Sequence, residues 1–223
     1  MRKAGMTKQE ITDYLNIDMR KIITDDIGQC LLIGKPEGGY FSIPKLVLSC
    51  VDYLGALYEG WNGERDSRTR RPIFTSSQKA THYIQNVLGQ VFYEYRTRGA
   101  LLWEIYRHGT VHLNQPKTLQ YGAETIGWLI IKGGFEERTF IVQLPTTGGQ
   151  KINKWIAHLV PDLYPNTTNE WFLPLSTTCL YEDLLKSLDV YIDMINKNPN
   201  LENNFRSAID EMIKPDQTQI TWH

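Results

Sequence analysis

The group of side chains best suited to catalysis lies in the segment 103–112. Arg107 and His112 are separated by four residues, and His108 directly follows the arginine. In a chain with 11 arginines and 5 histidines, chance gives about 0.03 matches to this spacing with Asn, Asp or His directly after the arginine. The pattern therefore calls for a chemical interpretation.

These side chains suit acid–base chemistry at a phosphate group. An imidazole accepts or donates a proton near neutral pH. A guanidinium holds two phosphate oxygens and offsets the charge that develops on them, so no metal ion is needed. In an unbroken α-helix, residues five apart point about 140° away from each other. Arg107 and His112 therefore need a kink near Gly109, or a second protomer, to form one site.

Two other interpretations of the same segment stay open. Glu104, His108 and His112 share one helix face, and two imidazoles with a carboxylate suit zinc or iron. Three residues at this spacing extend over about 12 Å, which is too far to meet at one ion. His108 and His112 alone could bind a metal if further ligands came from elsewhere in the chain, but our prediction is that no metal is bound. In the third interpretation, Arg107 pairs with an acidic side chain and both histidines are half-buried in a helical bundle.

Further arginines could contact the phosphates of RNA. Arg68, Arg70 and Arg71 fall in a polar loop, and Arg96 and Arg98 follow a predicted helix. The alternative for the loop is a purely solvated segment. The sequence contains no glycine-rich phosphate loop, no serine-nucleophile elbow and no zinc-protease motif, and we predict no cofactor.

The composition is that of an ordinary soluble globular protein. The chain has 223 residues, a formal charge of −1 and 41% hydrophobic residues, so it lacks the strongly basic character of many nucleic-acid-binding proteins. It contains no apolar run of the roughly 18 residues that span a membrane, and no apolar leader. Its three cysteines are widely spaced, which indicates free thiols in a reducing compartment. We expect a cytoplasmic protein without membrane contact.

The pattern of apolar residues predicts helices, then a β insert, then helices. Apolar stripes at helical spacing predict helices over 7–26, 43–59, 77–95, 100–114, 180–196 and 199–212. Residues 126–131 and 138–144 read as a β-hairpin, 171–175 as a third strand, and 155–159 as one helical turn. We predict one mainly helical α+β domain over 1–223, with a helical core over about 7–117 and 177–213 and a small antiparallel β insert over about 120–175.

Two segments resemble HEPN-like proteins, which are small helical bundles. YRHGTVHLNQPK, late in its helix, is similar to the Arg-polar-x3-His motif of HEPN domains. IPKLVLSCVDYLGALYEGW is similar to the first core helix of uncharacterised bacterial HEPN-like proteins. The resemblance covers about residues 40–117, and helices over 178–213 are compatible with it.

The resemblance implies a function and roles for three residues. Many HEPN proteins are metal-independent endoribonucleases of defence or toxin–antitoxin systems, and they work as dimers in which two motifs meet. On this basis Arg107 and His112 form the catalytic pair and His108 is the polar neighbour. The implied partners are a second copy of the chain, RNA and an antitoxin or other protein. Other HEPN-like proteins are non-catalytic modules that bind a partner protein, a nucleotide or RNA.

Overall fold

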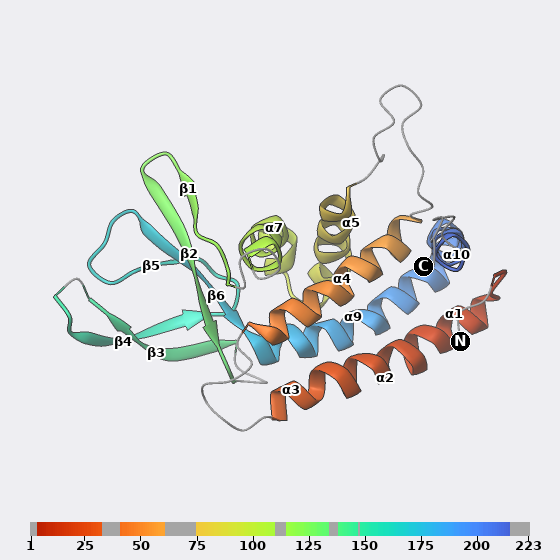
Figure 1. The fold of residues 1–223 in the computed structure, drawn as a ribbon, viewed down its shortest axis with the longest axis horizontal. Helices are drawn as coiled ribbons and strands as arrows, with labels where there is room; N and C mark the ends of the chain where they lie inside the picture. The colour runs from red at the N-terminus through yellow and green to blue at the C-terminus, as the bar shows by residue number, and fades with distance from the viewer. Residues whose placement is uncertain are drawn as a thin grey trace, which may run out of the picture.

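A computed structural model describes residues 4–32, 41–60, 75–109, 115–133, 138–146 and 148–214. Within these ranges the protein is a mainly helical α+β structure, as the sequence predicts. The helices gather on one side and the strands project from the other (Figure 1). Among the described helices, none is both long and apolar enough to cross a membrane.

The chain begins with one long helical run that alternates between α- and π-helical hydrogen bonding. The run starts with a capping box, in which the Thr7 side chain accepts from the Glu10 backbone and the Glu10 carboxylate accepts from the Thr7 backbone at 2.8 Å. Its buried face carries Ile11, Leu15 and Met19. The consecutive elements are α1 (Lys8–Asp13), η1 (Tyr14–Met19), α2 (Arg20–Ile23), η2 (Thr24–Gly28) and α3 (Gln29–Leu32).

The remaining helices form the body against which this run packs. They are α4 (Ser42–Glu59), α5 (Ser76–Tyr83), η3 (Ile84–Leu88), α6 (Gly89–Val91), α7 (Glu94–Leu102), η4 (Trp103–His108), α9 (Thr177–Lys197) and α10 (Pro199–Met212). Ser176 caps α9, and Asn198 caps α10 with Pro199 in its first turn. Phe41 stands at the N-cap of α4, and its side chain makes no capping bond.

The predicted break between the second and third core helices is misplaced by several residues. The break falls at Phe92, which is extended, whereas Arg96 and Arg98 lie inside α7. Gly89 makes the turn compact, because a Cβ there would lie 2.4 Å from the Arg96 side chain. Arg96 Nε instead donates to the Gly89 carbonyl at 3.1 Å.

The strands form two separate sheets, which corrects the predicted hairpin. One sheet has the order β1 (Leu119–Tyr121), β2 (Glu124–Ile131), β6 (Glu170–Ser176) and β5 (Asp162–Leu163). The other pairs β3 (Thr139–Pro145) with β4 (Lys151–Ala157). β2 runs parallel to β6, with Trp128 opposite Leu173, so the larger sheet is mixed and not antiparallel. The helical turn predicted over 155–159 is wrong, because most of that segment belongs to β4.

Burial on both faces of β6 explains why this strand, and not β3, lies beside β2. Ile130 on one face joins the main helical core, together with Leu173 and Leu175 of β6. The opposite face covers a second, smaller core formed by Leu144, Ile156 and Phe172. The larger sheet is therefore a middle layer between the helices and the β3–β4 pair. A strand buried on both faces typically has a parallel neighbour.

Candidate functional site

Arg107 is half-buried where η4 packs against α4. Its Nη2 donates to Asp52 Oδ2 over a long 3.3 Å, and its guanidinium lies 5.5 Å from the Trp103 ring centre. The side chain is 20% exposed. Its Nε is buried and has no hydrogen-bond partner among the described residues. Arg107 therefore has the acidic partner expected if its role is structural, namely Asp52, and it also has a hydrogen-bond donor, Nε, that is not used by any residue that the structure describes.

His108 lies beside Arg107 and is held by one neighbour on α5 and one on its own helix, η4. Its Nε2 is 3.1 Å from Ser77 Oγ of α5 and 3.8 Å from Glu104 Oε1. Lys117 Nζ donates to the same Glu104 carboxylate at 2.8 Å, and this bond is the main reason why the pKa of Glu104 is lowered. These contacts fix the imidazole at a partly exposed position beside the guanidinium.

The helix that carries these residues is not α-helical. η4 has the i to i+5 hydrogen bonding of a π-helix. Trp103 and His108, five residues apart, accordingly bring their ring centres within 6.3 Å. The 140° offset expected for an α-helix thus does not hold along this segment. His112 lies outside the described residues, so its distance from Arg107 stays a prediction.

Gly109 serves a different purpose from the predicted kink. Its backbone is helical, with φ −62° and ψ −54°. A Cβ at this position would lie 2.4 Å from the backbone nitrogen of Lys117, which donates to the Ile105 carbonyl at 3.0 Å. The glycine lets residues 115–117 return closely against the end of η4, which brings Lys117 to Glu104.

Lys79 is a buried cation in the same region that the sequence analysis missed. It is 4% exposed, and burial lowers its pKa to about 8, although Asp52 and Glu59 act in the opposite direction. Gly55 of α4 allows the close helix crossing, because a Cβ there would lie 2.7 Å from the Lys79 backbone. Asp52 could have indicated this cation from the sequence, because an acidic residue beside the apolar stripe of 43–59 needs a cationic neighbour. We call Asp52, Ser77, Lys79, Glu104, Arg107 and His108 the Arg107 cluster.

The other predicted phosphate-binding arginines separate into three groups. Arg96 takes part in the turn between α6 and α7. Arg98 lines a hollow between α7 and the larger sheet. Arg68, Arg70 and Arg71 lie outside the described residues.

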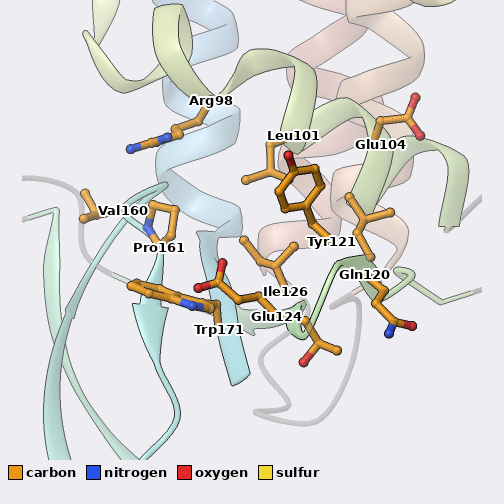
Figure 2. A pocket seen from close by; sticks show the side chains of 12 residues that line it. Arg98, Leu101, Glu104, Gln120, Tyr121, Glu124, Ile126, Val160, Pro161 and Trp171 are labelled. Atoms are coloured by element: carbon orange, nitrogen blue, oxygen red, sulfur yellow. The ribbon is translucent and has the colours of Figure 1, made fainter. Parts of the chain in front are cut away.

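The hollow beside Arg98 has a volume of about 660 Å³, which is within the usual range for ligand sites. Arg98 and Leu101 reach it from α7, Tyr121 from β1, Glu124 from β2 and Trp171 from β6 (Figure 2). Most of the remaining wall is apolar. Glu104 also lines this hollow and contacts His108, so the hollow and the Arg107 cluster share one residue.

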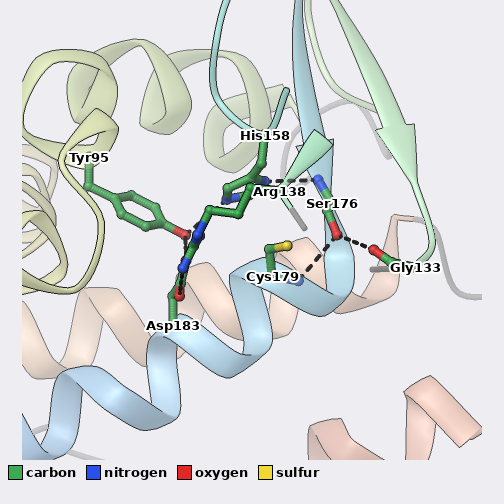
Figure 3. Close-up of polar contacts among 7 residues, drawn as sticks. All are labelled: Tyr95, Gly133, Arg138, His158, Ser176, Cys179 and Asp183. Atoms are coloured by element: carbon green, nitrogen blue, oxygen red, sulfur yellow. Dashed lines mark hydrogen bonds and ion pairs between the residues drawn. The ribbon is translucent and has the colours of Figure 1, made fainter. Parts of the chain in front are cut away.

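A buried polar network joins the β layers to the helices (Figure 3). Arg138 donates to both carboxylate oxygens of Asp183 at 2.7 Å, and Tyr95 donates to Asp183 at 3.0 Å. Tyr95 is also 3.2 Å from His158 Nε2. Arg138 and His158 are cross-strand neighbours just beyond the paired ends of β3 and β4. The network therefore anchors the base of the smaller sheet to α9.

The backbone of Ser176 assigns the tautomer of His158. The Ser176 N–H donates to His158 Nδ1 at 3.0 Å, so Nε2 carries the proton and donates to Tyr95, which in turn donates to Asp183. Burial, with a smaller effect of Arg138, lowers the pKa of His158 to about 3. The imidazole is neutral and inaccessible, which favours a structural role over acid–base catalysis.

This burial predicts a specific dependence of stability on pH. His158 is neutral in the fold down to about pH 3, whereas the unfolded chain takes up its proton near pH 6.5. The stabilisation is present above pH 6.5 and is lost as the pH falls. Going from pH 7 to pH 5 should lower the unfolding free energy by about 2 kcal/mol through this group. Urea denaturation at both pH values should show a smaller loss for His158→Gln, and equal losses would contradict the assignment.

Cys30, Cys50 and Cys179 form no disulfide with one another, and burial raises the pKa of the Cys50 thiol to about 11, which disfavours its nucleophilic thiolate form. Within the described ranges, no group of three or more His, Cys, Asp or Glu side chains could hold a metal ion.

The described structure thus defines a mainly helical α+β protein with a polar cluster on its helices and a hollow beside its sheet. No protein-family model, curated protein or solved structure matches the chain.

Proposed function

We propose that this chain is a HEPN-like, metal-independent endoribonuclease of a defence or toxin–antitoxin system. The observation that carries the proposal is the unused hydrogen-bonding capacity of Arg107 next to a fixed imidazole. Arg107 makes one long contact with Asp52, and its Nε has no partner in the described part of the chain. A phosphate group that reaches the exposed part of this side chain would pair with the guanidinium through two parallel bonds.

The proposed reaction is an intramolecular transesterification of a phosphodiester in single-stranded RNA. The 2′-oxygen forms a bond to phosphorus while the bond to the 5′-oxygen breaks, which gives a 2′,3′-cyclic phosphate and a 5′-hydroxyl end. His112 transfers the proton between the attacking and leaving oxygens, and Arg107 offsets charge on the non-bridging oxygens. His108, held by Ser77, supports the arrangement.

The test is to incubate the purified protein with end-labelled single-stranded RNA in the presence of EDTA. Cleavage products that end in a 2′,3′-cyclic phosphate are expected. The absence of cleavage under every condition tried would reject the proposal.

A second candidate is a non-catalytic HEPN-like module that binds a partner protein, a nucleotide or RNA. The observation in its favour is the charge balance of the Arg107 cluster. Asp52 already contacts Arg107, and Glu104 contacts His108. Carboxylates so close to both groups oppose the approach of a phosphate. RNA that binds and stays intact would favour this candidate.

We also expect a homodimer with the segment 103–112 at or near its interface. The resemblance to HEPN nucleases implies that two motifs meet in this way. Light scattering at tens of micromolar should give twice the chain mass of 25.8 kDa, because a stable interface of more than about 1,000 Å² persists at that concentration. The mass of a monomer would count against this arrangement.

A further inference from the structure

The hollow of Figure 2 forms where the larger sheet diverges from α7. Toward the C-terminal end of β6, Leu173 and Leu175 are fully buried in the helical core. Trp171, at the opposite end of the same strand face, stays half-exposed and lines the hollow. The larger sheet and the helices therefore pack closely at the C-terminal end of β6 and separate at its N-terminal end. Trp171 forms an aromatic wall of the opening at that end.

Three polar groups at this opening have unused bonding capacity. Trp171 Nε1 is buried and has no hydrogen-bond partner among the described residues. Arg98 and Glu124 are exposed, and neither side chain forms an ion pair with any described residue. Arg98 and Glu124 thus supply one cation and one anion, Glu104 adds a second carboxylate, and the rest of the lining is mostly apolar.

We propose that this hollow binds one nucleotide, with its base against Trp171 and its phosphate at Arg98. A base has the flat surface that stacks on the aromatic face of Trp171. Its amino group can donate to Glu124, and its phosphate pairs with a guanidinium. A volume of about 660 Å³ is ample for such a ligand.

The nucleotide has two sources, either a free nucleotide or one unit of single-stranded RNA. The second source rests on the proposed function, because Glu104 connects the hollow to the Arg107 cluster. A base seated in the hollow would then position the strand relative to Arg107. Binding of a free nucleotide does not depend on RNA cleavage by this protein.

The test is calorimetric titration of the full chain with AMP, with adenosine, with ribose 5-phosphate and with a short single-stranded oligoadenylate. AMP should bind more tightly than either adenosine or ribose 5-phosphate, since each lacks one of the two recognised groups. Trp171→Ala should weaken AMP binding roughly 5–150-fold, which corresponds to the loss of one stacked base. Arg98→Ala should weaken the binding of AMP and leave that of adenosine unchanged.

Matched variants show whether a loss of AMP binding comes from this site or from removing any exposed tryptophan or arginine. Trp155 is 65% exposed on β4 and does not line the hollow, so Trp155→Ala should bind AMP like the wild type. Arg20→Ala is the equivalent control for Arg98. Because Arg98 is exposed, its variant should stay folded even if Trp171→Ala does not. Equal losses in the Trp171 and Trp155 variants would overturn the proposal, as would no binding of AMP or oligoadenylate.

The two ligands and one further variant keep this inference separate from the proposed function. Binding of oligoadenylate without AMP assigns the site to RNA, and comparable binding of both assigns it to any nucleotide. Arg107→Ala should retain AMP binding, because Arg107 does not line the hollow. AMP binding in a protein that never cleaves RNA would support the hollow and reject the nuclease.

Discussion

Arg107→Ala is expected to lower the rate of RNA cleavage in EDTA by about 10²–10³-fold, the usual effect of losing one donor to a developing anion. His112→Ala should lower it by about 10²–10⁴-fold, because it removes proton transfer. His108→Ala should have a smaller effect, since its imidazole supports the pair. The rates are measured with single-stranded RNA and excess enzyme.

Two matched variants control for unspecific loss. Arg20 pairs with Asp189 on a different face of the bundle, so Arg20→Ala removes an arginine–aspartate contact remote from the Arg107 cluster. His82 forms the equivalent histidine control, because it pairs with Glu59 at 2.8 Å. Both variants should cleave RNA like the wild type. Cleavage that is unchanged in both the Arg107 and His112 variants would indicate a contaminating nuclease.

The contact with Asp52 makes it necessary to separate catalysis from folding. Arg107→Ala removes the contact between the guanidinium and the half-buried Asp52 carboxylate and is expected to cost some stability. Arg107→Lys keeps the positive charge beside Asp52 but cannot form the planar two-bond contact with phosphate. A folded Arg107→Lys variant with the rate of the wild type would show that the guanidinium serves only structure.

The helices could be predicted from the sequence because their apolar stripes are long and periodic. α4 buries Val47, Val51 and Leu54 at the predicted spacing. Glycine was a weaker guide, because its role depends on what approaches it. Gly89 accommodates the Arg96 side chain and Gly109 accommodates the backbone of Lys117, and neither neighbour can be identified from local sequence.

The pairing of the strands could not be predicted from the same information. Residues 126–131 and 138–144 are adjacent strands separated by glycine, which favours a hairpin by proximity. The partners of β2 are instead β1 and β6, with Ile126 opposite Trp171 of β6. Burial on both faces of β6 favours this arrangement, and burial is a property of the assembled layers.

The candidate site was predicted only in its central residues. The sequence indicated Arg107 and His108, and also an acidic partner in the structural interpretation. The identity of that partner, Asp52, depends on how α4 packs against η4. Ser77 and Lys79 join the cluster through the crossing of α4 and α5. The network around Asp183 was missed, because its members come from four segments that no short motif connects.

Arg138→Met is expected to lower the free energy of unfolding by about 3–5 kcal/mol, because it leaves a buried carboxylate without its cation. Asp183 is 1% exposed and Arg138 is 25% exposed. Removal of the arginine therefore leaves a charge that cannot reach water. The guanidinium also lies 4.1 Å from the Phe92 ring centre, so its packing is lost as well.

The double variant Arg138→Met/Asp183→Asn tests whether the buried charge is the cause. Asparagine removes the charge and keeps an acceptor for the Tyr95 hydroxyl, so the double variant should be more stable than Arg138→Met alone. Arg20→Met, which breaks an exposed pair, should cost less than about 1 kcal/mol. Urea denaturation of all three variants gives the comparison. A double variant no more stable than Arg138→Met would assign the loss to the packing of the arginine on Phe92, and the anchor between the sheet and α9 would then be apolar and not ionic.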